Sequence, residues 1–251
     1  MKRNYLSSAL IYTAVCTTAF ISACTGAATP NNAGNRAAAT PKVQATMPPN
    51  APAGAQPPNM SGSASAPVTV EEFADFQCGA CASIHPVMNE IKSMYGSRIR
   101  FIYRNYPLEM HDKAYDAAVA AEAAGLQGKF WDMQNLLFTN QKNWVSSNTY
   151  KQTFKEYAGK LGLDVAKWEN DIIGLPAKTR VDADKSRAKA LGIAGTPTLY
   201  INNTTVEFKD MNVQTLKTLI DAELQKAVSA PAAQPANSNA APAATPGNQN
   251  K

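Results

Sequence analysis

Two segments in the middle of the chain have the residue patterns of strands, and they flank a segment expected to be helical. Residues 68–76 are rich in valine and phenylalanine, and residues 98–103 alternate between polar and apolar side chains. Both patterns are typical of strands. Between them, residues 78–95 are predicted to form a helix that ends at Gly96. A strand, a helix and a strand in this order predict a parallel pair of strands with a right-handed crossover.

A long helical block follows, from Asp112 to Leu191. Glycine, asparagine and proline residues divide it into segments of helical character. The predicted helices are residues 112–127, 130–138, 150–161, 165–173 and 178–191. The large aromatic residues of the block are expected to form its core rather than a binding surface. They are Phe130, Trp131, Phe138, Trp144 and Trp168.

A hairpin and a helix are predicted after this block. Residues 198–201 and 205–208 have strand patterns, and between them lies Asn202-Asn203, a favourable turn pair. Residues 213–228 are expected to close the region with a helix. The order βαβ, helical block, ββα predicts an α/β fold.

The two flanks of the chain differ from this region in composition. Residues 25–66 and the residues after 228 consist largely of Ala, Pro, Asn, Gly and Ser, without apolar periodicity. Such segments bury too little apolar surface to offset the entropy lost on ordering. We therefore expect a flexible tether over residues 24–66, one folded domain over residues 67–228, and a disordered tail over residues 229–251.

The first residues have the pattern of an export signal. Lys2 and Arg3 precede a mostly apolar run over residues 6–21, which is short for a transmembrane helix and contains several Ser and Thr residues. The tetrapeptide Ile21-Ser-Ala-Cys24 resembles the bacterial lipobox, which implies removal of residues 1–23 and lipidation of Cys24. The chain would then reach the membrane through its lipid anchor only. An ordinary signal peptide cut nearby, with Cys24 incidental, is the alternative.

Charge excludes one class of partner. The acidic residues all lie between Glu71 and Glu223. Five basic residues lie outside residues 67–228, which leaves that segment neutral and places the net charge of +5 on the flanks. Nucleic-acid binding is therefore not expected, because it needs basic residues clustered on a folded surface.

Cysteine usage points to chemistry at one place. Of the four cysteines, Cys16 lies in the predicted signal and Cys24 is the predicted lipidation site. The folded region keeps Cys78 and Cys81, two positions on from a strand and at the start of a helix. A disulfide between them would close too small a loop to stabilise the fold by much. The pair is thus expected to serve redox chemistry or metal binding.

The position of the pair favours redox chemistry. A helix that starts at Cys78 directs its unpaired N–H groups and its positive dipole end at the Cys78 sulfur, which stabilises a thiolate. The small residues Gly79 and Ala80 allow the sharp turn that a disulfide needs. Zinc usually takes four ligands, and the chain has no second cysteine pair. A metal-binding envelope lipoprotein that uses Cys78, Cys81 and His85 remains the alternative.

Several motifs around this pair resemble the DsbA-like branch of the thioredoxin superfamily. Glu72 stands six residues before Cys78, where that branch has a buried acid, and Pro86 stands five residues after Cys81, where it has a helix proline. The run Gly195-Thr196-Pro197-Thr198 resembles the loop that carries the family's cis-proline. The resemblance covers residues 68–228. It implies a thioredoxin fold (βαβ + ββα) with a helical insertion at about residues 111–176.

The resemblance also implies roles for these residues. Cys78 and Cys81 would exchange disulfides with other proteins, and no cofactor beyond this pair is expected. Glu72, whose pattern neighbours are apolar, would be a buried proton relay with a raised pKa; a solvated residue at a strand end is the alternative. Thr196 and a cis Pro197 would bind extended substrate, although an ordinary trans proline fits the sequence as well. His85 is more simply a helix residue beside the kink at Pro86.

Direction, partners and location follow as expectations. The best-known members have a histidine between the cysteines, and this chain has Gly79-Ala80, so we expect a milder oxidant that acts as an oxidase, with isomerase or reductase work still open. The expected partners are unfolded or partly folded secreted proteins with thiols, and a membrane redox partner that resets the pair. The expected location is the periplasmic side of the bacterial envelope, with the outer membrane favoured over the inner. A non-catalytic scaffold lipoprotein with a relic site is the remaining alternative.

Overall fold

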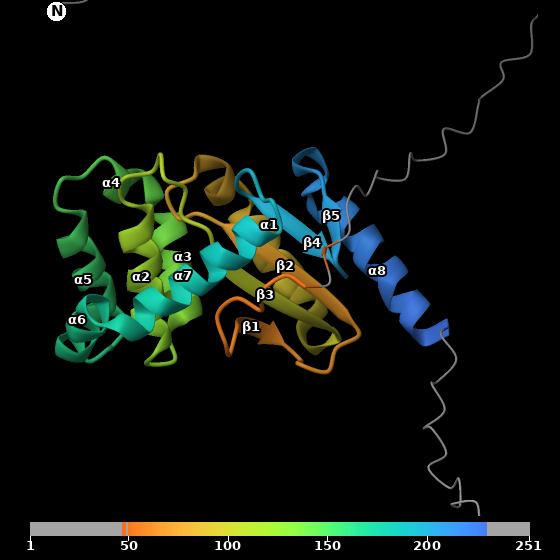
Figure 1. The fold of residues 1–251 in the computed structure, drawn as a ribbon, viewed down its shortest axis with the longest axis horizontal. Helices are drawn as coiled ribbons and strands as arrows, with labels where there is room; N and C mark the ends of the chain where they lie inside the picture. Colours follow the sequence, from red (N-terminus) through yellow and green to blue (C-terminus); the bar gives the residue numbers. More distant parts are fainter. Residues whose placement is uncertain (1–46, 49, 230–251) are drawn as a thin grey trace, which may run out of the picture. The chain divides into compact units, whose positions relative to one another are not determined.

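The structure, a computed structural model, describes residues 47–48 and 50–229. In this part of the chain five strands form one sheet in the order β1-β3-β2-β4-β5 (Figure 1). The strands are β1 (Asn59–Gly62), β2 (Val68–Ala74), β3 (Ile99–Asn105), β4 (Thr198–Ile201) and β5 (Thr204–Val206). The helices are α1 (Gly79–Tyr95), α2 (Ala114–Gly125), α3 (Phe130–Thr139), α4 (Gln141–Val145), α5 (Tyr150–Lys160), α6 (Val165–Ile173), α7 (Leu175–Ala190) and α8 (Val213–Ser229).

The sheet contains the predicted βαβ unit. Strands β2 and β3 are parallel, with Glu72 opposite Tyr103, and α1 connects them. Strand β4 pairs antiparallel with the other side of β2, and β5 with β4. The predicted order of elements, βαβ, helical block and ββα, is confirmed for residues 68–229. The helices α2 to α6 stack beside one end of the sheet, on the left in Figure 1, and α7 crosses in front of it.

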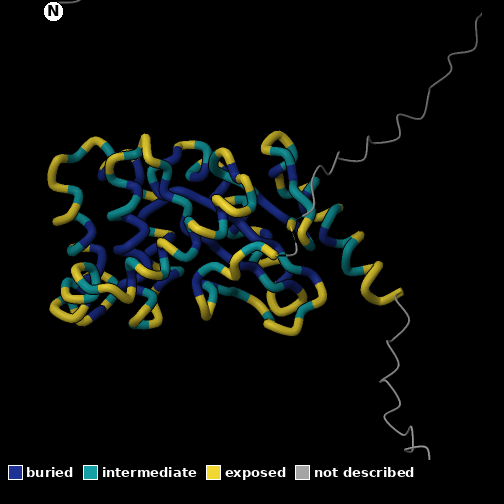
Figure 2. The backbone as a smooth tube through the Cα atoms, in the orientation of Figure 1, coloured by how far each residue is buried: buried dark blue, intermediate teal, exposed yellow. Residues whose placement is uncertain are grey.

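Strand alternation separates the chemistry of the two sheet faces. Glu72 on β2 and its neighbour Tyr103 on β3 face one side, and Glu71 and Arg104 face the other. Arg104 and Glu71 bind side chains of α7, whereas Glu72 interacts with Lys92 of α1. The two strands and the inner sides of the helices are buried, and the loops and the end of α8 are exposed (Figure 2). The predicted aromatic core of the helical block is confirmed for Phe130, Phe138, Trp144 and Trp168, which are buried, while Trp131 is partly buried.

The predicted tether was wrong for its last part. Residues 50–66 are part of the fold, and β1 adds an antiparallel strand to β3, with Asn59 opposite Tyr103 and Gly62 opposite Arg100. The described residues do not include the predicted signal peptide (residues 1–23), Cys24, the tether up to residue 46, or residues 230–251. Helix α4 was also missed, and α7 begins at Leu175, earlier than predicted.

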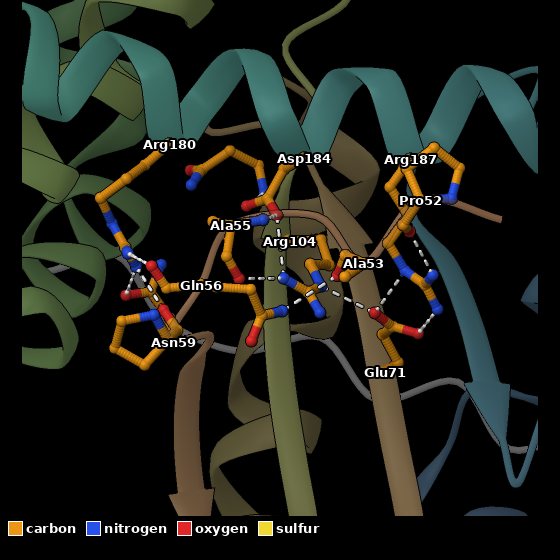
Figure 3. Close-up of polar contacts among 12 residues, drawn as sticks. Pro52, Ala53, Ala55, Gln56, Asn59, Glu71, Arg104, Arg180, Asp184 and Arg187 are labelled. Atoms are coloured by element: carbon orange, nitrogen blue, oxygen red, sulfur yellow. Dashed lines mark hydrogen bonds and ion pairs between the residues drawn. The ribbon is translucent and has the colours of Figure 1, made fainter.

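The segment before β1, which we call the strap (residues 50–57), is held mainly through its backbone (Figure 3). Asp184 of α7 accepts a hydrogen bond from the Ala55 N–H at 2.8 Å, and Arg104 of β3 donates to the Ala55 carbonyl at 2.9 Å. Two further arginines of α7 bind strap carbonyls: Arg187 donates to Pro52 at 2.7 Å and Arg180 to Pro57 at 3.0 Å. Because the side chains that hold the strap come from elsewhere in the chain, its own composition gave no sign of order.

The same side chains form an ion-pair network against the sheet. The Glu71 carboxylate lies 2.7 Å from Arg104 Nε and 2.8 Å from Arg187 Nη2, and Asp184 lies 3.0 Å from Arg104 Nη1 (Figure 3). Burial opposes ionisation of Glu71, but the hydrogen bonds and charges of Arg187 and Arg104 outweigh it and lower its pKa. The network joins the strap, the sheet and α7, so that α7 has a fixed place on the sheet.

The β4–β5 turn offers a small test of the fold. Asn202 and Asn203 both have positive φ, 45° and 67°, as a two-residue hairpin turn requires. A β-branched residue does not adopt this conformation without strain. We expect Asn203→Val to lower the free energy of unfolding by about 1 to 3 kcal/mol, and Asn203→Gly to be tolerated. Urea unfolding of both variants checks this; equal stability of the two would show that the turn is not as described.

Candidate active site

Cys78 occupies the N-cap of α1, directly after a tight turn. Strand β2 ends at Ala74, and Asp75 folds the chain back: its carboxylate accepts from the Gln77 N–H at 2.7 Å and its carbonyl from the Cys78 N–H at 3.1 Å. The Cys78 backbone is extended, with φ −70° and ψ 119°, and its carbonyl accepts the helical bond from Ala82. The helix therefore starts at the first cysteine, as predicted, and its free N–H groups face the Cys78 side chain.

The two sulfurs have opposite acidities. Both cysteines are free thiols and buried. A hydrogen bond from the Cys81 side chain, together with backbone N–H groups of Cys81 and Ala80, outweighs burial and lowers the pKa of Cys78 to about 5. Burial and the neighbouring Cys78 raise the pKa of Cys81 well above its usual value. Of the two sulfurs, Cys78 is therefore the one that ionises at neutral pH, and Cys81 is the one that keeps its proton.

The loop before β4 faces the first cysteine. The Thr196-Pro197 peptide bond is cis, as predicted. In its protonated form the Cys78 thiol donates to the Thr196 carbonyl oxygen, which lies 3.3 Å from the sulfur. The Thr196 hydroxyl is buried without a hydrogen-bond partner of good geometry among the described residues, and it lies near enough to both sulfurs to lower the pKa of each. The structure thus brings Thr196 and Pro197 together with the cysteine pair.

We expect Thr196→Val to raise the pKa of Cys78 by about one unit, because a hydrogen bond to a charged group contributes roughly 1.5 kcal/mol or more. The pH dependence of the thiolate's ultraviolet absorbance measures this. Thr198→Val is the matched control, since the Thr198 hydroxyl donates to the Gly195 carbonyl at 2.8 Å. An equal change in both variants would show that the Thr196 hydroxyl does not act on the sulfur.

Glu72 is buried, as its pattern neighbours indicated. It is 3% exposed, and this burial raises its pKa to about 7, an effect that Lys92 partly opposes. The Lys92 ammonium lies over the ring of Trp131, 4.3 Å from its centroid. The alternative of a solvated strand-end residue is therefore excluded. A carboxyl with this pKa can both give and take a proton near neutral pH.

Tyr103 belongs to the same buried region and was missed from the sequence. It is opposite Glu72 in the sheet and fully buried, and its hydroxyl has no hydrogen-bond partner among the described residues. Burial, followed by the charges of Glu72 and Cys81, raises the pKa of Tyr103 well above its usual value. The position in an alternating strand indicated only a core aromatic residue.

Two glutamines, Gln77 and Gln141, hold residues 76–78, which we call the active-site turn. Both were also missed from the sequence. Gln77 donates to Asp112 at 2.8 Å and accepts from the Lys113 N–H at 2.7 Å. Gln141 of α4 donates to backbone carbonyls at both ends of the turn. The histidine His111 binds the other side of this turn, with Nδ1 2.8 Å from the Asp75 carboxylate. These contacts join positions far apart in sequence, so no local signal could show them.

The geometry around His85 does not favour a metal site. His85 Nε2 lies 3.1 Å from Asn135 Oδ1 and 3.0 Å from Asn89 Nδ2, and its ring packs against Phe138. Pro86 lies within α1, as expected. Over residues 47–48 and 50–229, no three side chains of His, Cys, Asp or Glu come together in a group that could hold a metal ion.

A comparison with known protein families agrees with this arrangement. The sequence pattern of a family described as Thioredoxin matches residues 55–222. The chain belongs to this thioredoxin family. The match begins within the strap, twelve residues before the domain start that the composition suggested, which supports the place of the strap in the fold.

Curated relatives of this thioredoxin chain match it over part of their own length. A region of the Na(+)/H(+) antiporter NhaA 1 of Mycolicibacterium gilvum is 35% identical over 147 residues, which is 57% of this chain and 23% of that protein. The NhaA 3 antiporter of Salinispora tropica is 34% identical over 145 residues, 57% of this chain and 21% of that protein. The chain thus spans little more than a fifth of the length of these relatives. Within its described residues, none of the helices has the length and apolar character needed to cross a bilayer.

Solved structures show which form of the thioredoxin fold this is. The α-DsbA1 of Wolbachia pipientis superposes with a TM-score of 0.61 at 22% identity, covering 69% of this chain and 94% of that one. Oxidised BdbD of Bacillus subtilis gives 0.59 at 24% identity, with 70% and 98% covered. The predicted thioredoxin fold with a helical insertion of the DsbA kind is therefore confirmed.

Proposed function

We propose that this protein is a thiol–disulfide oxidoreductase that exchanges disulfides with other proteins through Cys78 and Cys81. The observation that supports it best is the opposite acidity of two sulfurs at one helix start, an acidic Cys78 and a buried, non-acidic Cys81. The thioredoxin family membership and the fold neighbours, which include DsbA-type oxidoreductases, agree with this chemistry.

The proposed oxidation begins with the Cys78–Cys81 disulfide. A client thiolate attacks Cys78 Sγ, the Cys78–Cys81 bond breaks, and its electron pair leaves on Cys81, which takes up a proton. A second client thiolate then attacks the client sulfur of the mixed disulfide, and Cys78 leaves as a thiolate. The client gains a disulfide, and the protein is left reduced. Because a low pKa makes a good leaving group, the acidity of Cys78 favours this release.

Glu72 is the proposed source of the proton for Cys81. Its pKa of about 7 leaves it partly protonated at neutral pH, and it shares the buried region of Cys81 and Tyr103. In the reverse direction, the ionised carboxylate accepts the proton when Cys81 attacks. The cis loop is proposed to hold the client: an extended client segment would pair with the backbone of Thr196 and Pro197 and place its sulfur against Cys78.

We propose that the chain works as an oxidase, because stabilising the Cys78 thiolate stabilises the reduced form and makes the disulfide a stronger oxidant. Gly79-Ala80 supplies no charged group to this effect, so a milder oxidant with some isomerase activity is expected. The proposed clients are secreted proteins with free thiols, and a membrane redox partner would reoxidise the pair. The proposed location is the periplasmic side of the bacterial envelope, with Cys24 lipidated and the outer membrane favoured.

Oxidative refolding of reduced, unfolded ribonuclease tests this function. The oxidised protein is expected to restore ribonuclease activity faster than a glutathione buffer alone, and Cys78→Ala to give no acceleration. The equilibrium with glutathione then gives the direction of exchange. If the wild-type protein and Cys78→Ala refold ribonuclease equally slowly, the proposed function is wrong, and the alternative of a non-catalytic envelope protein gains support.

A further inference from the structure

Gln141, the first residue of α4, reaches the active-site turn from the helical block. Its Nε2 donates to the Phe76 carbonyl at 2.7 Å and to the Cys78 carbonyl at 2.9 Å, so both amide protons are in use. The residue is 8% exposed. Two short hydrogen bonds from one buried amide fix the carbonyls on either side of Gln77 relative to each other.

The two carbonyls lie where the acidity of Cys78 is determined. The Cys78 carbonyl also accepts the Ala82 N–H at 3.1 Å, the bond that begins α1. The backbone N–H groups of Ala80 and Cys81, in the same first turn, stabilise the Cys78 thiolate. Any movement of the Cys78 backbone therefore changes how these donors meet the sulfur. In addition, the Gln141 N–H at the Cys78 carbonyl offsets part of the negative charge of that oxygen, which would otherwise oppose the thiolate charge.

Further contacts close a ring between the turn and the helical block. Gln77 accepts from the Lys113 N–H at 2.7 Å, and the Lys113 ammonium donates to the carbonyl of Val145, at the end of α4. Helix α4 is thus attached to the turn at its start through Gln141 and at its end through Lys113 and Gln77. This arrangement gives the helical block a direct mechanical connection to the redox pair.

We propose that Gln141 is a positioning residue that sets the redox poise of Cys78 by holding both ends of the active-site turn. This inference rests on the proposed thiol–disulfide exchange. Loss of the two donors should make the reduced form less stable relative to the disulfide, and so make the protein a weaker oxidant. A residue that only stabilises the fold would change the free energy of unfolding in both redox forms and leave the thiolate unaffected.

The test compares Gln141→Met, which keeps the length of the side chain and removes both donors, with the wild-type protein. We expect the pKa of Cys78 to rise by about one unit and the glutathione equilibrium constant to shift about tenfold toward the disulfide form, which corresponds to about 30 mV. Gln141→Glu is the second variant: an ionised carboxylate donates to neither carbonyl and a protonated one to only one of them, so in either form the shifts should have the same sign. It also gives an answer should Gln141→Met not fold.

Gln127→Met is the matched control. Gln127 is another glutamine of the helical block whose side chain makes two backbone bonds, with the Asp164 N–H at 3.0 Å and the Asp164 carbonyl at 3.1 Å, and it is away from the turn. The Gln127→Met variant is expected to leave the pKa of Cys78 and the glutathione equilibrium unchanged. If Gln141→Met and Gln141→Glu also leave both unchanged, the proposal is overturned, while ribonuclease refolding by the wild-type protein would still support the function. A wild-type protein without exchange activity would instead reject the function itself.

Discussion

A Cys81→Ala variant is expected to trap client proteins as long-lived mixed disulfides and to lose turnover. Its Cys78 thiolate can still attack a client disulfide, because its acidity also draws on the backbone donors of the first helical turn and on Thr196. The second thiol that would resolve the complex is missing. Incubation of the reduced variant with an oxidised client, followed by electrophoresis without reductant, should show a new band of the summed mass that disappears with dithiothreitol.

Cys78→Ala is the matched control for this trap. It keeps one thiol, but that thiol is buried, and its pKa is raised above the usual value. We therefore expect no trapped complex from Cys78→Ala at neutral pH. Equal trapping by both variants would mean that the sulfurs are not differentiated as described, and trapping by Cys78→Ala alone would reverse their roles.

Glu72→Gln is expected to slow exchange and to stabilise the fold at alkaline pH. The side chain keeps its size but carries no proton to transfer, so the step in which Cys81 leaves or attacks should slow by up to about a hundredfold. The ordinary carboxyl pKa of 4.5 is raised to about 7 in the folded protein, mainly by burial. A carboxyl whose pKa is higher in the folded protein than in the unfolded chain makes the folded state more stable at low pH than at high pH. At low pH it is protonated in both states, so that no charge has to be buried.

This contribution is lost as pH rises from 4.5 through 7, because the unfolded chain ionises freely and the folded protein must then bury a charge. The difference in pKa, which already includes the opposing effect of Lys92, corresponds to about 3 kcal/mol at most. The free energy of unfolding of Glu72→Gln should therefore change less between pH 5 and pH 8 than that of the wild-type protein. At pH 8 it should exceed the wild-type value. Urea unfolding at both pH values measures this.

Glu90→Gln is the control for Glu72, since Glu90 is an exposed glutamate of α1. It should change neither the exchange rate nor the pH dependence of stability. If Glu72→Gln behaves as Glu90→Gln does, the buried carboxyl has no part in the proton transfer.

The parts of the fold that the sequence predicted are those in which local pattern and packing agree. The strands β2 and β3 are apolar or alternating because they are buried, and α1 begins at Cys78 because the turn and the small residues after it allow a helix start. The roles of Glu72, Thr196 and Pro197 came from a family resemblance. The structure adds that Glu72 is buried and that the Thr196-Pro197 loop faces Cys78.

The parts that the sequence did not predict depend on partners far along the chain. The strap lacks apolar side chains at regular spacing, and it is ordered by the arginines and aspartate of α7, more than a hundred residues away. Gln141 is a polar residue in a short helix, and its two carbonyl partners lie more than sixty positions earlier. Hydrogen bonds to backbone groups leave no trace in the residue types of the segment that receives them.

The proposed exchange chemistry depends most on the acidity of Cys78. The direct measurement is a pH titration of its alkylation rate in the reduced protein, with Cys78→Ala to identify the signal. The rate is expected to reach half of its maximum near pH 5. A midpoint near 9, the ordinary thiol value, would mean that the helix start and the Thr196 loop do not stabilise the thiolate, and it would contradict the proposed mechanism.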